Sequence, residues 1–256
     1  MTRKHDEVVG SRSDARSYYD DFSRRYDRGR DRESYHQMLD DLELDILQPY
    51  AEQGRVLEVG CGTGRLLKPV ENVSRLAVGL DLSPGMLALA RKRGLQVVQG
   101  SALQMPFRDA CFDLVYSFKV FPHVPDLRSA LEEANRVLRP GGHLVFEVYN
   151  PLSIRYVSKL IAGPKRIGLN HTERDIYTRW DLPWKVSRSF PSDAVLVETR
   201  GVRIVTPFAG LHRLPGVGRC LRAVEQRLSG SALRLFAGFY VVVLRKVALR
   251  DSERIK

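Results

Sequence analysis

The sequence has no long apolar run, few cysteines and no leader-like start. Its longest apolar run, Phe236 to Leu244, is far short of the ~18 residues that a membrane-spanning helix requires. The first residues, MTRKHDEVV, lack the apolar stretch of a secretory signal. The three cysteines (Cys61, Cys111 and Cys220) are widely separated with no CxxC spacing, which argues against a zinc site or a disulfide framework. We therefore expect a cytoplasmic chain without a metal site.

Charge is distributed unevenly along a chain of otherwise ordinary composition. With 43% hydrophobic and 28% charged residues, the sequence is typical of a globular domain and is long enough to bury a core without disulfides. The formal net charge is +11, yet residues 151–256 alone hold 20 Lys or Arg against 8 Asp or Glu. This excess indicates either an anionic partner (an acidic small molecule, a phospholipid surface or nucleic acid) or a solvated basic surface.

The order of the apolar patterns predicts three segments of one α/β domain. Residues 1–14 are polar and without period, which is typical of a disordered tail. Residues 15–150 are expected to form N-terminal helices and a ligand-binding core. Residues 151–256 are expected to form a lid or substrate region, followed by two strands at Ala194–Val205 and Phe239–Val247.

Short apolar runs alternate with amphipathic stretches in the middle of the chain. Strands are predicted at Val56–Val59, Leu76–Leu80, Leu95–Val98, Phe112–Tyr116 and Leu144–Val148, and helices at Arg65–Glu71, Pro84–Arg93 and Leu127–Leu138. Ser83 and Asp126 are suited to cap the second and third of these helices. The alternation is typical of a parallel sheet with helices on both faces.

A glycine-rich segment, Gly60-Cys61-Gly62-Thr63-Gly64, follows the first of these strands. Glycines allow a tight turn and let a ligand approach without meeting Cβ atoms. The amino end of the following helix would offer free N–H groups to an anion. A dinucleotide-binding fingerprint needs glycine where this chain has Arg65, and no Gly-Lys-Ser/Thr follows to make a P-loop. Both of those classes are therefore disfavoured.

Asp81 lies at the end of the next predicted strand, 17 residues after Gly64. The carboxyl ends of adjacent parallel strands lie side by side, so this carboxylate can reach a ligand on the glycine loop. It can accept hydrogen bonds from both hydroxyls of a ribose, and charge-assisted bonds of this kind contribute roughly 1.5–3 kcal/mol. The alternative is that Asp81 only caps the helix that begins after Ser83.

These residues and two further segments resemble the class I S-adenosylmethionine-dependent methyltransferases, in particular the methyltransferase type 11-like branch that includes ubiquinone and menaquinone biosynthesis enzymes. GSALQMPFRDACFDLVYSF at 100–118 is similar to the family's third and fourth strand region. HVPDLRSALEEANRVLRPGGHLVFEVYN at 123–150 is similar to the helix, turn and fifth strand that follow. The resemblance covers residues 55–150. It implies a Rossmann-like, seven-stranded, mostly parallel sheet with a final antiparallel strand, N-terminal helices and an inserted C-terminal lid.

The resemblance also implies S-adenosylmethionine as cofactor and assigns contacts to the matching positions. The glycine loop and Glu58 would hold its methionine portion, and Asp81 would hold its ribose. The full set of implied cofactor contacts is Glu58, Gly60, Cys61, Gly62, Gly64, Asp81, Leu82, Met86, Ser101, Ala102, Leu103, Ser117 and Phe118. Ser101 stands where the family often has aspartate, so its bond to the adenine amino group would be a neutral one, worth roughly 0.5–1.5 kcal/mol.

Methyl transfer from a sulfonium is an in-line displacement, in which the protein mainly aligns the nucleophile and excludes water. A hydroxyl acceptor would profit from a general base, and His123, just beyond the fourth strand, is the candidate. A structural histidine bonded to its own loop is the alternative.

Acceptor contacts are predicted from topology alone, and each of these aromatic residues is equally compatible with ordinary core packing. The predicted set is Tyr18, Tyr26, Tyr156, Tyr177, Trp180 and Trp184. Arg155, Arg174 and Arg179 could hold an anionic acceptor, with a solvated basic face as the alternative.

The leading hypothesis is methyl transfer to oxygen or carbon of a small, lipophilic or aromatic metabolite. An RNA methyltransferase is the second hypothesis, prompted by the basic C-terminal segment, but no RNA-binding module or base-methylation signature is present, so nucleic acid is not the expected partner. The third is a basic module with a vestigial cofactor site that docks on anionic membranes through an arginine-flanked stripe at residues 217–228. Peripheral membrane contact through this basic region is also compatible with the first hypothesis.

Overall fold

The computed structural model describes residues 15–23, 26–27, 34–163, 166–167, 171–172, 176–214 and 216–247, so the predicted tail at 1–14 lies outside the described residues. The elements are, in chain order, a helix over residues 15–23, α2 (Ser34–Ala51), β1 (Arg55–Val59), α3 (Leu67–Glu71), β2 (Leu76–Asp81), α4 (Pro84–Lys92), β3 (Val97–Gln99), β4 (Phe112–Ser117), η1 (Phe121–His123), α5 (Leu127–Val137), β5 (Leu138–Tyr149), α6 (Ile154–Ala162), β6 (Arg166–Ile167), β7 (His171–Thr172), η2 (Pro183–Ser189), β8 (Ala194–Val202), η3 (Ala209–Arg213), α7 (Val217–Ser229), η4 (Ala232–Phe236) and β9 (Phe239–Lys246), where η marks a 3₁₀ helix.

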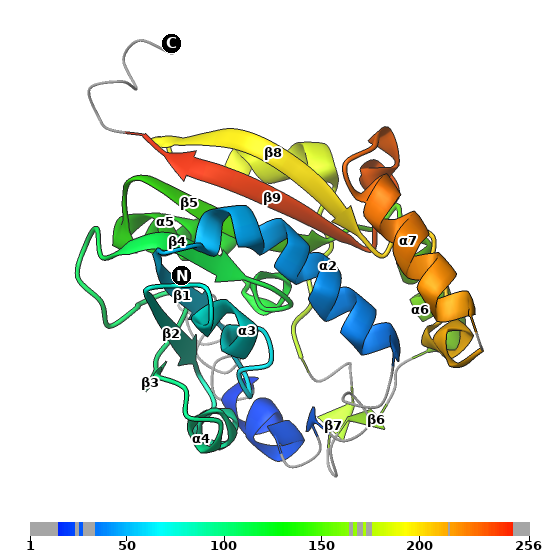
Figure 1. Cartoon of the computed structure of the whole chain (residues 1–256), viewed down its shortest axis with the longest axis horizontal. Coiled ribbons are helices and arrows are strands. Elements are labelled where there is room, and N and C mark those ends of the chain that lie inside the picture. The colour runs from blue at the N-terminus through cyan, green and yellow to red at the C-terminus, as the bar shows by residue number, and fades with distance from the viewer. Residues whose placement is uncertain are drawn as a thin grey trace, which may run out of the picture.

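Seven strands form one sheet in the order β3-β2-β1-β4-β5-β9-β8 (Figure 1). Strands β1 to β5 pair in parallel, and β9 is antiparallel to both of its neighbours. This confirms the expected Rossmann-like sheet with an antiparallel final strand. Strand β5 begins earlier than predicted, at Leu138, because the Pro140–Gly142 turn forms an irregularity within the strand rather than a break before it.

Helices cover both faces of the sheet because successive strand residues point in opposite directions. Val56, Leu114 and Val145 pack toward α2, in a buried cluster that continues onto α3. The adjacent positions Leu57, Val115 and Leu144 pack toward α5 and η2. The capping predictions are confirmed, since the Ser83 side chain accepts from the Met86 N–H and the Asp126 side chain accepts from the Ser129 N–H.

The carboxyl ends of β1, β2 and β4 meet at one edge of the sheet, and the N-terminal helix lies across this edge (Figure 1). Asp20 of that helix accepts hydrogen bonds from the Ser83 hydroxyl and, at 3.0 Å, from the Gly85 N–H. Asp27 accepts from the Thr63 hydroxyl and pairs with Arg93 at 2.9 Å. These bonds fix the N-terminal segment over the glycine loop and the start of α4.

Helix α7 contains the stripe predicted over residues 217–228, and only part of its apolar surface is free. Val224 is exposed, while the opposite side of the helix packs on α2, η3 and β8. The carboxylate of Glu225 is fully buried on that side and accepts bonds from three successive N–H groups, those of Ile204, Val205 and Thr206, at 2.6–3.0 Å. The Thr206 hydroxyl donates to it as well. This side chain therefore fixes the turn that follows β8.

Glu225→Gln should destabilise the fold, because an amide NH₂ would replace one acceptor oxygen and face buried N–H donors. Leaving buried hydrogen-bonding groups unsatisfied costs about 1–3 kcal/mol. The measurement is the free energy of unfolding in urea. Glu132→Gln, which alters an exposed Arg128–Glu132 pair on α5, is the matched control and should have a far smaller effect. Equal effects of the two variants would contradict the anchoring role.

Candidate functional site

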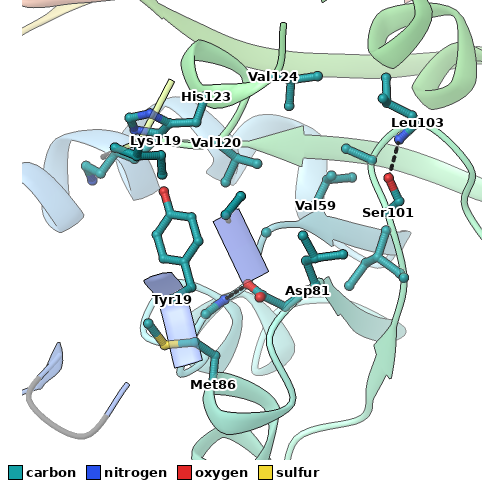
Figure 2. Close-up of a pocket in the computed structure, with 18 of the residues that line it drawn as sticks. Tyr19, Val59, Asp81, Met86, Ser101, Leu103, Lys119, Val120, His123 and Val124 are labelled. Atoms are coloured by element: carbon teal, nitrogen blue, oxygen red, sulfur yellow. Dashed lines mark hydrogen bonds between the residues drawn. The ribbon is translucent and has the colours of Figure 1, made fainter. Parts of the chain in front are cut away.

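Two adjoining cavities open at the edge where β1, β2 and β4 end. The first has a volume of about 240 Å³ and extends from the glycine loop and Asp81 to the Ser101–Leu103 segment after β3. Figure 2 shows Asp81 and Tyr19 facing into it, with Met86 on one side and His123 at one end. The second has a volume of about 330 Å³ and extends from the glycine loop toward α6 and the start of β9.

The glycine loop has left-handed backbone angles at the positions that border the cavities. Gly60 has φ +77°, and a Cβ there would meet a methyl of Val120 at 2.1 Å. Gly62 has φ +53° and open space where its Cβ would be, so a ligand can approach its backbone closely. The helix after the loop begins at Leu67, two residues later than predicted, and is one short turn. The anion-binding capacity of this loop therefore depends on its own N–H groups rather than on a long helix.

Asp81 ends β2 with its carboxylate in the first cavity. Oδ2 accepts from the Gly62 N–H at 2.8 Å and Oδ1 accepts from the Ser83 N–H at 2.9 Å. Burial raises the pKa of Asp81, and these N–H bonds act in the opposite direction. The residue therefore ties the glycine loop to α4 and still presents a carboxylate to the cavity, so both roles considered from the sequence coexist.

Apolar and small residues line the rest of the first cavity, among them Leu82, Met86, Ala102 and Leu103. The Ser101 hydroxyl, also in the wall, accepts from the Leu103 N–H at 3.2 Å. A flat aromatic ligand fits such walls because its faces prefer apolar contacts while its edge needs polar ones.

Seven residues border both cavities and define the junction between them, and Lys119 is the charged one. The junction residues are Tyr19, Tyr26, Gly60, Phe118, Lys119, His123 and Ile176. Lys119 has φ +62°, its Nζ pairs with Glu43 of α2 at 2.5 Å, and its N–H donates to Glu147 of β5 at 2.9 Å. Burial alone would lower the pKa of Lys119, but the two carboxylates raise it, so the ammonium stays charged.

Glu147 is fully buried beside this ammonium. Burial and the charge of Glu43 raise the pKa of Glu147 to about 8, although Lys119 acts to lower it. Its second oxygen, Oε2, has no hydrogen-bond partner. The side chain is therefore mostly protonated at neutral pH.

His123 is held in one orientation at the junction. Its Nδ1 lies 2.9 Å from the carbonyl oxygen of Tyr177, and because a carbonyl can only accept, Nδ1 carries the proton. The Tyr149 hydroxyl lies 3.4 Å from the unprotonated Nε2. Burial lowers the pKa of His123 to about 4, so the ring is neutral at physiological pH.

The second cavity has aromatic and cationic walls. Its aromatic residues include Tyr18, Tyr35, Tyr149 and Phe239, and its cations are Arg65, Lys119, Arg155, Lys159 and Arg203. Two carboxylates also lie in the wall. Asp40 pairs with Arg65 at 2.8 Å, and Glu58 accepts from the Tyr116 hydroxyl while burial raises its pKa well above the usual value.

Not every residue predicted for the site reaches a cavity. The Ser117 hydroxyl donates to the Val59 carbonyl within the sheet, and Gly64 packs against Leu95 instead of bordering a cavity. Cys61 contributes to the second wall, but its sulfur packs beneath Gly79.

Among the predicted aromatic residues, Tyr18 borders the second cavity, Tyr177 the first, and Tyr26 both. Trp184 is exposed, and Tyr156 and Trp180 pack on each other behind the wall. Of the three arginines, Arg155 reaches the second cavity, Arg179 pairs with Asp181, and Arg174 lies outside the described residues. The roles of the residues that do reach a cavity stay predictions.

Several wall residues were not predicted from the sequence, namely Lys119, Tyr149, Lys159, Arg203 and Phe239. Lys119 lies two residues after the end of β4, and Tyr149 is the last residue of β5. Their position at the carboxyl edge of the sheet could therefore have marked them as candidate site residues. Arg203 and Phe239 come from the antiparallel half of the sheet, and no local pattern marks them.

Within the described part of the chain, no group of His, Cys, Asp or Glu side chains is placed to bind a metal ion. In the same residues, no helix combines the length and apolarity needed to cross a membrane.

A family model for a methyltransferase domain matches residues 57–146, from β1 to β5. The matched segment contains the glycine loop, Asp81 and His123. It confirms the resemblance of this part of the chain to methyltransferase domains.

Curated relatives match over the same region. Demethylmenaquinone methyltransferase of Corynebacterium glutamicum is 29% identical over 150 residues, 56% of this chain and 63% of that protein. Phthiotriol/phenolphthiotriol dimycocerosates methyltransferase of Mycobacterium leprae is 39% identical over 111 residues, 38% of each chain. Probable tRNA methyltransferase 9B of Mus musculus is 37% identical over 107 residues, 41% of this chain and 24% of that protein. The matched segment thus spans less than two thirds of each relative.

Solved structures extend the likeness beyond the matched domain. A SAM-dependent methyltransferase from Thermotoga maritima, described as a possible histamine N-methyltransferase, superposes with a TM-score of 0.65 at 21% identity. The superposition covers 90% of this chain and 99% of that one. At this identity the likeness establishes the shared fold.

Relative to the Glu147→Gln variant, the wild-type protein should lose stability as pH rises from 5.5 to 8. The folded-state pKa of Glu147, about 8, lies above the usual value for a glutamate, so the folded protein keeps a proton that the unfolded chain releases in this window. Glutamine cannot titrate and still accepts from the Lys119 N–H. Urea unfolding at both pH values should show a wild-type loss larger by about 1–3 kcal/mol than that of the variant. Parallel losses in the two proteins would contradict the assignment.

Proposed function

We propose that this chain, whose residues 57–146 form a methyltransferase domain, transfers a methyl group from S-adenosylmethionine to an oxygen or carbon of a small lipophilic or aromatic metabolite. The observation that carries the proposal is the junction, where a cavity suited to a nucleoside meets an aromatic cavity of small-molecule size. Two of the relatives are named for methylation of a quinone precursor and of a lipid, which supports a lipophilic acceptor.

The residues of the first cavity fit the cofactor. The backbone at Gly62 is open to a ligand, Asp81 presents a carboxylate for a ribose, and Met86 provides an apolar face for adenine. Glu58 and Gly60 border the second cavity, where the glycine loop would hold the methionine portion. The bound cofactor supplies a methyl group already activated by the sulfonium.

The protein's own contribution is alignment and exclusion of water. Phe118 and Tyr19 form apolar walls at the junction, and the N-terminal helix covers it. His123 presents an unprotonated Nε2 on the side of the Tyr149 hydroxyl, so it can accept a hydrogen bond or a proton from an acceptor hydroxyl. Its low pKa suits an acceptor that ionises readily, such as an enol or an acidic phenol.

Asp81→Asn should weaken binding of S-adenosylhomocysteine at least tenfold, because a neutral amide cannot replace the charge-assisted bonds to a ribose. Isothermal titration calorimetry measures this directly. Asp109→Asn removes an exposed carboxylate on another surface and should leave the affinity unchanged. If the wild type binds neither S-adenosylmethionine nor S-adenosylhomocysteine, the proposed function is wrong.

His123→Gln should reduce methyl transfer about 100-fold or more while leaving the affinity for S-adenosylhomocysteine within twofold. The base must be unprotonated, and the pKa of His123 is about 4. Protonation of His123 should therefore not reduce wild-type turnover between pH 8 and 6, and should reduce it only as the pH approaches 4. The assay is transfer of label from methyl-tritiated S-adenosylmethionine to a panel of naphthols and hydroxybenzoates. Unchanged turnover in the variant would assign His123 a purely structural role.

A further inference from the structure

The second cavity contains a cation that no carboxylate of the described residues contacts directly. Arg155 projects from the first turn of α6, and its guanidinium carbon lies 4.2 Å from the ring centre of Tyr149, 4.7 Å from that of Phe239 and 5.1 Å from that of Trp180. Its Nη1 is buried and has no hydrogen-bond partner in the part of the chain that the structure describes. A buried guanidinium donor without an acceptor is costly unless a ligand completes it.

The surrounding backbone is shaped to hold this side chain. A Cβ at Gly238 would lie 3.0 Å from Cδ of Arg155, so glycine leaves the space that the arginine stem occupies. The start of α6 is fixed by Ser153, whose side chain accepts from the Tyr156 N–H. Asn150 accepts from the Leu152 N–H and donates to the Leu235 carbonyl. Arg155 is therefore positioned before any ligand arrives.

The nearby carboxylates are engaged elsewhere or carry little charge. Asp40 pairs with Arg65, and burial raises the pKa of Glu58 well above its usual value. Glu147 is close enough for Arg155 to lower its pKa, but its hydrogen bond comes from the Lys119 N–H. Arg155 thus borders the cavity with a buried Nη1 that no carboxylate of the described residues contacts.

A second arginine, Arg203, adds positive charge to the second cavity, but its donors are bonded to backbone carbonyls and not to a ligand. The guanidinium of Arg203 lies 5.3 Å from the ring centre of Tyr35, and its Nε and Nη2 donate to the carbonyls of Thr206 and Pro207. Lys159, one helical turn after Arg155, also borders the cavity, with Nζ 5.9 Å from the ring centre of Trp180. The cavity is therefore positively charged on the side away from the cofactor and aromatic between its cations.

We infer that Arg155 binds an anionic group of the methyl acceptor, a carboxylate, phosphate or sulfate, while Tyr35, Tyr149 and Phe239 contact its apolar part. This inference rests on the proposed function, because it takes the second cavity as the acceptor site. Charge-assisted, forked bonds from a guanidinium discriminate strongly between an anion and a neutral analogue of the same shape. The acceptor class is thereby narrowed to amphiphilic or aromatic anions.

The test compares two fluorescent probes that differ only in one sulfonate. The anionic probe is 8-anilinonaphthalene-1-sulfonate and the neutral one is N-phenyl-1-naphthylamine. Each is titrated into protein saturated with S-adenosylhomocysteine, so that the first cavity and the part of the second cavity beside the glycine loop are filled. The wild type should bind the anionic probe at least tenfold more tightly. Arg155→Met, which keeps the length of the stem, should abolish most of this preference, and Arg155→Lys should retain part of it.

The matched control is Arg219→Met, which removes an exposed cation from α7 and should leave the preference intact. Calorimetry should give the same affinity for S-adenosylhomocysteine, within twofold, in every variant. An intact preference in Arg155→Met would overturn the inference. So would a tenfold loss of S-adenosylhomocysteine affinity in that variant, because Arg155 would then bind the cofactor's own carboxylate.

Two further readouts separate failure of this inference from failure of the proposed function or of the fold. If the wild type does not bind S-adenosylhomocysteine, the proposed function fails, and with it the identification of an acceptor. If circular dichroism shows that Arg155→Met is unfolded, the inference is tested by the probe preference of the wild type and of Arg155→Lys. If the wild type binds the two probes with nearly equal affinity, that result alone overturns the inference.

Discussion

The ion pair between Lys119 and Glu43 is the interaction on which the architecture of the site depends. It joins the bend after β4 to α2, and the Lys119 N–H extends the connection to Glu147 on β5. Because Lys119 has a left-handed backbone angle, the chain turns sharply there and separates one cavity from the other. The partly buried ammonium is stabilised at this point by the Glu43 carboxylate, and Glu147 from a different element lies close by. The position of the junction thus follows from a charge cluster beneath it rather than from the sheet alone.

The electrostatic character of the site suits the proposed reaction. Transfer of a methyl group from a sulfonium to an anionic or ionising acceptor reduces the separation of charge, and a water-poor wall favours such a step. Tyr19 and Phe118 provide that wall at the junction, while Arg155 places a positive charge on the far side of the second cavity. The two ends of the acceptor would therefore meet different environments, an apolar one at the reacting atom and a cationic one at the anchoring group.

Local signals in the sequence were enough to predict the parallel strands and the helix caps. The caps at Ser83 and Asp126 and the placement of Asp81 at a strand end follow from neighbours within a few residues, and the structure has each of them. The acceptor half could not be predicted this way. Arg155 and Arg179 look alike in the sequence, and only tertiary packing pairs one with Asp181 and leaves the other facing a cavity. Trp184 was predicted to contact the acceptor only because it is aromatic, and its side chain is exposed.

The strand order has a consequence for the time at which each cavity comes into existence during synthesis. Strands β1 to β4, with the glycine loop and Asp81, are complete once the first half of the chain has emerged. The wall of the second cavity draws on Tyr18 near the beginning and Phe239 on β9, the last strand, which inserts between β5 and β8. A nascent or truncated chain that lacks β9 therefore cannot complete the second cavity. Ribosomal release of the final strand marks the earliest point at which the two halves of the site can face each other.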